Sequence, residues 1–311
     1  MRTISRLFCL IGVCFSACAA AAAQDTGAAP AVGGQASEVD ITAKFDARKL
    51  EKEIIPRFID LHAIPNARQQ QIGRWFIPLC PETQGLKSKE DEFVTKRILE
   101  VAARAGAPAA SSSECQTNVD VVFTFDPQQQ IDYLAHQNAE ILGFHYAAQR
   151  KKLTTITHPI QAWYVTGTRS RAGGNHANSG ATLILDGLVM DSPNSLAAAG
   201  QAGSRLGDQR RTEFMRVTVI VNAEAMSQYP LSVVSDYIAM LVLSRAGQDQ
   251  CNELQSILDL LASCAETNKP ASLTVADEAF LKALYKSGLD AFLNRERGEI
   301  HEWMVRGIVS K

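Results

Sequence analysis

A β-branched strand followed by an unusually apolar helix is predicted over Val217–Leu243. In the helical part, two adjacent stripes of apolar residues recur at helical spacing, so most of the helix surface should be buried. We expect this helix at about 232–246, with Ser232 as N-cap, Asp236 in the first turn and Gly247 at its end. A strand that leads into a buried helix is typical of an α/β (α+β) fold, with a mixed sheet packed against helices.

The first residues have the pattern of an export signal. Met1–Ala23 carries Arg2 and Arg6, then an apolar run that ends in three alanines, so we expect cleavage after Ala23. An alternative is a lipoprotein box over Phe15–Cys18, in which Cys18 would be acylated. No other stretch reaches the roughly 18 apolar residues of a membrane span. The sequence therefore predicts a periplasmic or secreted protein without a transmembrane span after signal removal.

Composition divides the remaining chain into a tether and one domain. Residues 24–40 begin with a segment rich in Ala, Gly, Pro and Gln, which predicts a disordered tether, and residues 41–311 are long enough for a single α/β domain. Without Arg2 and Arg6, 29 basic residues remain against 33 acidic ones, a net charge near −4. This charge disfavours nucleic acid and anionic membrane surfaces as the main partner.

Four cysteines remain after removal of the leader, and in an exported protein they most simply form two disulfides. We favour Cys80 with Cys115 and Cys251 with Cys264, because each pair closes a local loop and contributes about 3–4 kcal/mol in the chain-entropy model. A straight helix over 252–263 would separate its ends by about 18 Å, too far for a disulfide. That helix must therefore be short, or the chain must double back. The alternative is a zinc site of four thiolates, for which the CxxC spacing is absent.

Strand and helix patterns also alternate outside the central segment. A helix over Ile41–Ile64, broken near Pro56, should pack on the domain from outside as an N-terminal extension. Four elements are then expected in chain order: a strand over Ile72–Cys80, a helix capped by Ser88 and Asp91 with Phe93 on its buried face and Gly106 at its end, a strand over Val119–Phe123, and a helix with Asp126 as N-cap. Near the C-terminus we expect a helix capped by Thr274 and Asp277, then a terminal helix over Leu289–Val309 with Ala291, Phe292, Ile300, Trp303 and Met304 as its apolar residues.

A loop rich in Gly, Asn and Ser follows a predicted edge strand over Ala162–Thr168. It holds Arg169, Arg171 and His176. One interpretation is a long hairpin with a mobile tip. The other is a ligand-facing loop, because basic side chains on Gly-rich loops bind carboxylates and phosphates. The spacing does not resemble a phosphate-binding P-loop.

Four segments together resemble exported bacterial proteins whose fold is similar to a minimal zincin, the α/β catalytic domain of HExxH metalloproteases. They are the RWFIPLC segment that ends at Cys80, the NVDVVF segment after Cys115, the helix over Leu231–Leu243 and the LTVADEAFLKALY segment that ends at Tyr285. This resemblance implies a zincin-like sheet with the central helix beneath the place of a zinc site.

The zinc motif itself is missing from that helix. Zinc needs two imidazoles at i and i+4, with a carboxylate beside the first. Ser235 and Ala239 occupy the two histidine places, Asp236 occupies the glutamate place, and Arg245 occupies the place of the third ligand. No catalytic residue and no metal or other cofactor is therefore assigned.

Other groups in the sequence could carry chemistry, but each also has a structural explanation. His136, His145 and His158 could share a metal, but histidines near helix ends and turns are usually structural. No GxSxG elbow or free thiol nucleophile is present. Asp236 is a candidate functional acid, although a carboxylate near a helix start is a sufficient explanation.

These patterns predict a non-catalytic, metalloprotease-like binding or envelope protein, a pseudoenzyme whose partner is an envelope protein or peptide. Two alternatives stay open. One is an envelope hydrolase that uses Asp236 and the loop of Arg169, Arg171 and His176. The other is a lipid-anchored structural protein.

Overall fold

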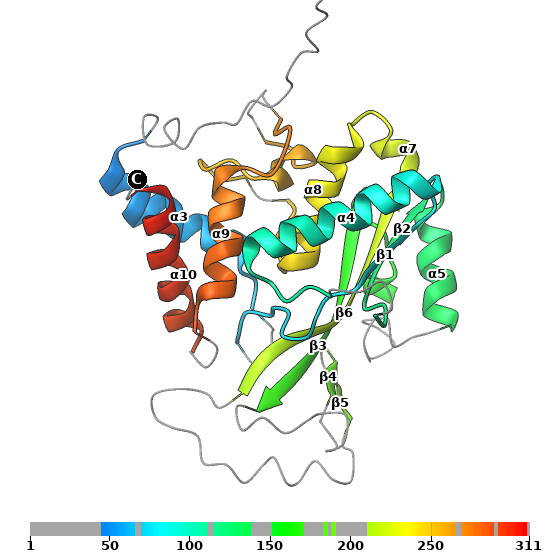
Figure 1. The fold of residues 1–311 in the computed structure, drawn as a ribbon, viewed down its shortest axis with the longest axis horizontal. Helices are drawn as coiled ribbons and strands as arrows, with labels where there is room; N and C mark the ends of the chain where they lie inside the picture. The colour runs from blue at the N-terminus through cyan, green and yellow to red at the C-terminus, as the bar shows by residue number, and fades with distance from the viewer. Residues whose placement is uncertain are drawn as a thin grey trace, which may run out of the picture. The chain divides into compact units, whose positions relative to one another are not determined.

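The computed structural model describes residues 45–65, 70–110, 115–137, 151–170, 183–185, 188–190, 210–249, 251–264, 269–288 and 292–309. The predicted signal peptide, lipoprotein box and tether lie outside these ranges. The fold is mixed α/β, as predicted (Figure 1). Its helices are α2 (Ala47–Lys49), the π-helix η1 (Leu50–Ile54), α3 (Ile55–His62), α4 (Ser88–Ala105), α5 (Pro127–Gln137), α7 (Ala223–Met226), α8 (Leu231–Leu243), the 3-10 helix η4 (Ile257–Leu260), α9 (Val275–Lys286) and α10 (Leu293–Ile308).

Four strands form the main sheet in the order β1-β2-β6-β3. Strands β1 (Pro81–Gln84), β2 (Val119–Thr124) and β6 (Arg210–Asn222) are parallel, and β3 (Ile160–Ser170) runs antiparallel to β6. The position of β3 at the sheet edge confirms the predicted edge strand. A second, two-stranded sheet pairs β4 (Leu183–Leu185) with β5 (Leu188–Met190).

Both faces of the main sheet are covered by apolar side chains. Val219 and Val221 of β6 belong to the main hydrophobic core, which also contains the side chains of α4, α8 and α9. Ile220, which lies between them, instead packs with Ile131 of α5 and Trp163 of β3. Because side chains alternate along a strand, α5 lies on the face opposite to α8. The unbroken apolar run in β6 is the sequence signal of this burial on both faces.

The segment before Cys80 is not the first strand, so that prediction is wrong. Strand β1 begins only at Pro81, and residues 71–75 are all buried. Burial of five successive residues shows that this segment passes through the interior. It makes isolated bridges between Arg74 and Glu213 and between Leu79 and Ala109. The apolar residues of this segment predicted a strand, but its buried polar groups bond to distant elements: Arg74 Nη1 donates to Ser287 Oγ at 2.8 Å and Trp75 Nε1 to Val242 O at 2.8 Å.

The N-terminal helical segment belongs to the core, contrary to the expected packing from outside. Leu50, Ile54, Ile55 and Phe58 are at most 2% exposed and lie in the main hydrophobic cluster. Helix α3 packs beside α10, and α10 beside α9 (Figure 1). The predicted irregularity near Pro56 is present as the change from the π-helix η1 to α3, whose first turn contains the proline.

Helix α8 starts and ends earlier than predicted. Its N-cap is Pro230, whose carbonyl accepts from Val233 N at 3.0 Å, so Ser232 lies inside the helix. The helix ends at Leu243 with Ser244 as C-cap. Gly247, the predicted stop, instead donates its N–H to Leu61 O at 3.1 Å and connects the chain to the end of α3.

At other helix ends, some of the predicted caps are present and others are not. Asp126 caps α5 through Gln129 N at 2.9 Å, and Thr274 forms a capping box with Asp277, both as predicted. Gly106 is the C-cap of α4, in a left-handed conformation with φ of 82°. The N-cap of α4 is Lys87 rather than Ser88, and its backbone N–H donates to Glu90 Oε2 at 3.3 Å. Phe93, which was predicted on the buried face of α4, is 44% exposed.

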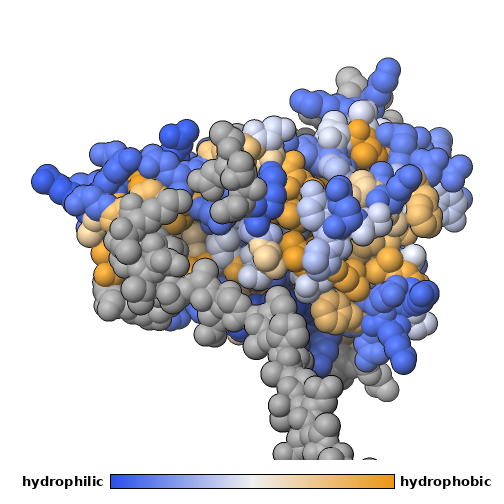
Figure 2. Space-filling model, turned by 90° about the horizontal axis from the view of Figure 1, so that it is seen from above, coloured by the Kyte–Doolittle hydropathy of each residue, from blue (hydrophilic) through white to orange (hydrophobic). Residues whose placement is uncertain are grey.

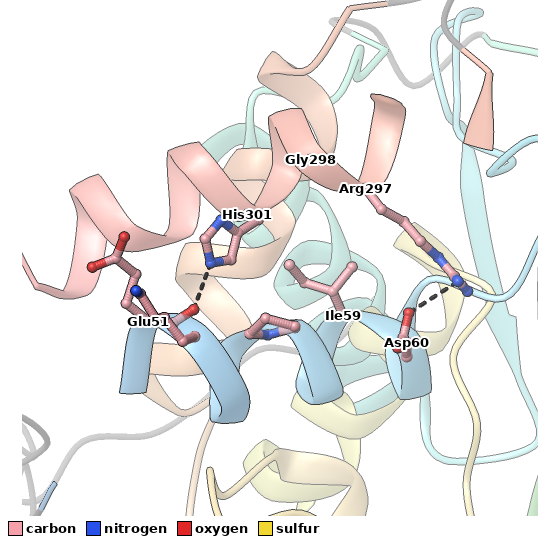
Figure 3. Close-up of a pocket in the computed structure, with 8 residues that line it drawn as sticks. Glu51, Ile59, Asp60, Arg297, Gly298 and His301 are labelled. Atoms are coloured by element: carbon pink, nitrogen blue, oxygen red, sulfur yellow. Dashed lines mark hydrogen bonds and ion pairs between the residues drawn. The ribbon is translucent and has the colours of Figure 1, made fainter. Parts of the chain in front are cut away.

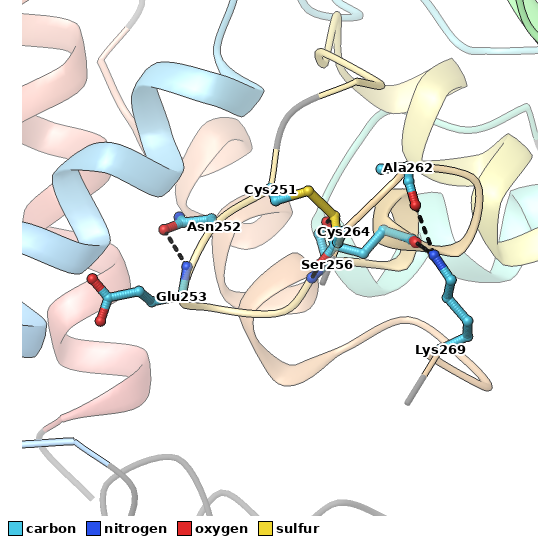
Figure 4. The surroundings of a disulfide bond; sticks show 8 residues. Cys251, Asn252, Glu253, Ser256, Ala262, Cys264 and Lys269 are labelled. Atoms are coloured by element: carbon cyan, nitrogen blue, oxygen red, sulfur yellow. Dashed lines mark hydrogen bonds between the residues drawn. A yellow bond between two sulfur atoms is a disulfide. The ribbon is translucent and has the colours of Figure 1, made fainter. Parts of the chain in front are cut away.

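Two disulfides close the pairs that the sequence analysis favours. The Cα atoms of Cys80 and Cys115 are 6.0 Å apart, and those of Cys251 and Cys264 are 5.6 Å apart. The chain between Cys251 and Cys264 doubles back around the single turn of η4, which resolves the geometric difficulty (Figure 4). Lys269 Nζ holds this turn by donating to Asp259 O at 2.8 Å and Ala262 O at 2.7 Å. The disulfides fit a protein that folds outside the reducing cytoplasm.

Exposed apolar residues lie on several separate elements. On the face seen in Figure 2, hydrophobic residues lie in separate areas between hydrophilic ones. None of the helices in the described ranges has the length and apolarity needed to cross a membrane.

Candidate functional site

Helix α8 occupies the centre of the core, and the residues compared above with the zincin motif are buried in the protein interior. Every residue from Val233 to Leu243 is buried. Ser235, at the first histidine place, is 0% exposed and donates its hydroxyl to Leu231 O at 2.6 Å. Ala239, at the second, is also 0% exposed. Neither residue can contact a molecule in solvent.

Asp236 is held by a two-pronged ion pair. Its carboxylate accepts from Arg97 Nε at 2.6 Å and Arg97 Nη2 at 3.1 Å, and also from Leu273 N at 3.1 Å. The hydrogen bond to Asp236 raises the pKa of Arg97 above its usual value. Because α8 begins at Leu231, Asp236 lies in the second turn. The predicted first-turn position and helix-dipole explanation are therefore wrong, and Asp236 instead joins α8 to α4 and to the segment before α9.

The last carbonyl groups of α8 are capped by side chains from three other segments. The final C=O groups of a helix have no partner within the helix, and here they are buried. The bonds are Tyr164 Oη to Leu241 O at 2.9 Å, Trp75 Nε1 to Val242 O at 2.8 Å and Tyr285 Oη to Leu243 O at 2.9 Å. Burial raises the pKa of both tyrosines, which keeps them protonated as donors. Trp75 is 1% exposed, so it both packs in the core and caps this helix end.

The other predicted site residues do not gather around α8 in the described part of the chain. The backbone of Arg169 lies in β3 opposite Arg211, whereas Arg171 and His176 lie outside the described residues. The Arg245 carbonyl accepts from Ile64 N at 3.2 Å. The predicted meeting of Asp236 with Arg171 and His176 therefore involves residues outside the described ranges.

The two alternative metal sites, one of three histidines and one of four cysteines, can be compared with the described residues. His136 is exposed on α5, His145 lies outside the described residues, and His158 Nε2 lies 2.7 Å from Asp249 Oδ1. Among the described residues no group of three or more His, Cys, Asp or Glu side chains could hold a metal ion. All four cysteines of the predicted domain are paired, so the four-thiolate zinc alternative does not describe this structure.

A groove lies between the N-terminal helical segment and α10, with a volume of about 470 Å³ (Figure 3). One wall is formed by η1 and α3 through Glu51, Lys52, Pro56, Ile59 and Asp60. The opposite wall is formed by α10 through Arg297, Gly298 and His301. We call it the α3–α10 groove.

Polar contacts connect the two walls at both ends of the groove. At one end, Arg297 Nη1 lies 2.9 Å from Asp60 Oδ1. At the other, His301 Nε2 lies 2.7 Å from the Glu51 carbonyl oxygen, so this nitrogen carries the hydrogen and donates. Between the ends, Ile59 faces the α10 wall near Gly298 (Figure 3).

The backbone explains why the Glu51 carbonyl is free for His301. In the π-helix η1, Ile55 N–H bonds to the Leu50 carbonyl, five residues earlier. The next donor in this pattern would be residue 56, which is proline and has no N–H. The carbonyl of Glu51 therefore lacks that helical partner and accepts from α10 instead.

The sequence did not predict this groove, because both of its walls have the patterns of packing helices. Two signals were available in the sequence: Pro56 inside one predicted helix and Gly298 inside another. Each residue is unfavourable in a helix interior and therefore calls for a structural explanation. What no pattern could give is that two segments separated by most of the chain lie side by side.

No protein-family model, curated protein sequence or solved structure shows a significant match to this chain.

Proposed function

We propose that this is an exported, non-catalytic binding protein of the cell envelope, with a fold similar to a zincin that lacks the zinc site. The observation that supports this proposal best is the burial of the helix on which a zincin would carry its chemistry. At the motif places, Ser235, Asp236 and Ala239 are at most 1% exposed. A catalytic group must reach its substrate, and none of these three side chains does so.

The hydrogen bonds of α8 support the same conclusion. Ser235 bonds within its own helix, and Asp236 accepts three hydrogen bonds from Arg97 and Leu273. Removing Arg97 from Asp236 to free the carboxylate would leave a buried charge without its ion-pair partner, which costs about 3–5 kcal/mol. The polar groups of α8 therefore serve to join elements of the fold.

The export part of the proposal rests on the leader-like sequence at Met1–Ala23 and on the two disulfides. We place the mature protein in the periplasm or outside the cell, with an envelope protein, a peptide or a smaller molecule as its ligand. Acylation of Cys18 would attach the same domain to a membrane without changing this role.

The test is metal content and peptide hydrolysis of the mature protein, purified from the periplasm without a metal-binding tag. We expect no stoichiometric zinc by elemental analysis and no turnover of a mixed, fluorescently labelled casein substrate, with or without added zinc. The matched control is the Asp236→Asn variant, whose signal should equal that of the wild type. Zinc-dependent hydrolysis that survives repurification and disappears with a chelator would overturn the proposal.

A further inference from the structure

We infer that the α3–α10 groove binds a neutral, largely apolar small molecule. This inference rests on the proposed binding function and names the chemical class of ligand. The groove is remote in sequence from Ser235, Asp236 and Ala239. Ligand binding in the groove and the absence of catalysis can therefore be tested separately.

The size and the lining of the groove suit such a ligand. Its volume of about 470 Å³ lies within the roughly 300–1,000 Å³ typical of small-molecule sites. Ile59 and Pro56 supply apolar surface on one wall, and Gly298 on the other exposes backbone without a side chain. The body of a bound molecule would therefore contact mainly carbon atoms.

Gly298 is the observation that intramolecular packing does not explain. Glycine is less favourable than alanine in a helix interior, and Gly298 lies within the 16 residues of α10. A Cβ atom at this position would meet no other atom within 4 Å, so no neighbouring element requires the glycine. A ligand that packs directly on the α10 backbone explains the absence of a side chain at 298.

The groove is formed before any ligand binds. The bond from His301 to the Glu51 carbonyl and the pair of Arg297 with Asp60 hold its two walls at both ends. The π-helix that frees the Glu51 carbonyl lies on the wall itself, and π-helical turns occur frequently at functional sites. A preformed site loses less conformational entropy on binding than one that must close.

The charges around the groove favour a ligand without net charge. The lining contains two acidic side chains, Glu51 and Asp60, and two basic ones, Lys52 and Arg297. Asp60 and Arg297 neutralise each other at 2.9 Å. A polyanion or an anionic headgroup would find no excess positive charge here, whereas an aromatic ring can lie against a guanidinium group.

The probe for the test is N-phenyl-1-naphthylamine, a neutral aromatic compound whose fluorescence rises in apolar surroundings. We would titrate it into the mature wild type and into the Gly298→Leu variant, which places a side chain in the groove. The control is Glu302→Leu, which adds the same side chain at a position on α10 that is 68% exposed and outside the groove lining. Urea unfolding of each variant shows that it is folded, and leucine at 298 should not weaken the helix.

We expect saturable binding of one probe per wild-type molecule, at least tenfold weaker binding to Gly298→Leu, and binding to Glu302→Leu within twofold of the wild type. The inference is overturned if the wild type shows no saturable binding, or if Gly298→Leu binds as tightly as Glu302→Leu. Neither result bears on zinc content or hydrolysis. A result that contradicts ligand binding in the groove is therefore distinguishable from a result that contradicts the proposed non-catalytic function.

Discussion

The indole Nε1 of Trp75 donates a hydrogen bond to the main-chain oxygen of Val242 over 2.8 Å. These residues are far apart in the sequence, and the bond caps a helix end that water cannot reach. Tyr164 and Tyr285 cap the neighbouring carbonyls in the same way. Helix α8 can therefore be both apolar and central, because side chains from three separate segments donate hydrogen bonds to the carbonyl groups at its C-terminal end.

Removal of one capping donor should destabilise the protein without changing its shape. Tyr285→Phe deletes only the hydroxyl and leaves the Leu243 carbonyl buried without that donor, so the free energy of unfolding should fall by about 1–3 kcal/mol. Urea unfolding measures this change. Tyr133→Phe removes the hydroxyl of a tyrosine that is 58% exposed and should have no measurable effect. Equal stability of the two variants would contradict the capping role.

The pair of Arg97 with Asp236 should show strong and unequal effects of its two members. Arg97→Ala leaves the carboxylate of Asp236, 1% exposed, without its cation, and should cost about 3 kcal/mol of stability. Asp236→Ala should cost less, because the Arg97 side chain is 26% exposed and can turn toward water. A double-mutant cycle in urea gives the coupling energy. Independent effects of the two substitutions would show that the pair does not act as a unit.

His62 should make the protein sensitive to acid. Its side chain is 1% exposed, stacks on Phe58 with ring centroids 4.0 Å apart, and lies 2.8 Å from the Phe58 carbonyl oxygen. Burial lowers the pKa of His62 to about 4. The folded state thus disfavours the imidazolium, and the stability contributed by His62 is present above pH 6.5 and lost as the pH falls from 6.5 to 4. This loss amounts to about 3 kcal/mol.

Replacement of His62 by leucine tests that contribution directly. The stability gap between the wild type and His62→Leu should narrow by about 3 kcal/mol between pH 7 and pH 4, measured by urea unfolding at each pH. Ile55→Ala, at a buried residue that does not titrate, should keep a constant gap over the same range. A constant gap for His62→Leu as well would contradict this assignment.

Asp277 should act with the opposite sign in an overlapping range. Burial raises its pKa to about 6, although Ser256, Thr274 and Ile257 all donate hydrogen bonds to the carboxylate. The stability that Asp277 contributes is present below its unfolded pKa, near 3.8, and is lost as the pH rises to about 6. Between pH 6 and pH 4 the two residues therefore oppose each other. In the His62→Leu variant only Asp277 of these two residues remains. The free energy of unfolding of this variant, measured in urea, should therefore rise on acidification over this range.

Gly298→Ala should stabilise the protein by about 0.5–1 kcal/mol, because alanine is the better helix former and its Cβ would meet no other atom within 4 Å. Gly106→Ala is the matched control. A Cβ there also meets nothing within 4 Å, but the backbone φ is 82°, which disfavours alanine. Thermal unfolding should therefore show opposite shifts for the two variants. Destabilisation by Gly298→Ala would mean that the glycine has a structural role in α10.

Local sequence patterns determined the elements whose causes lie within a few neighbouring residues. The β-branched run of β6, the apolar stripes of α8 and the caps at Asp126 and Thr274 were all predicted, because strand propensity, helical spacing and capping act over short distances. The favoured cysteine pairs also follow from local loops. These features are sufficient for the mixed α/β class.

Only the tertiary structure decided what the polar residues do. The partner of Asp236 is Arg97 on another helix, so its lone position on an apolar helix had suggested a cap or a functional acid. The apolar segment 72–80 predicted a strand, but residues 72–75 are buried in the interior, where the Trp75 indole donates to the end of α8. The α3–α10 groove likewise depends on two helices at opposite ends of the described chain. Contacts between residues far apart in sequence form only when the chain is packed, and no local period records them.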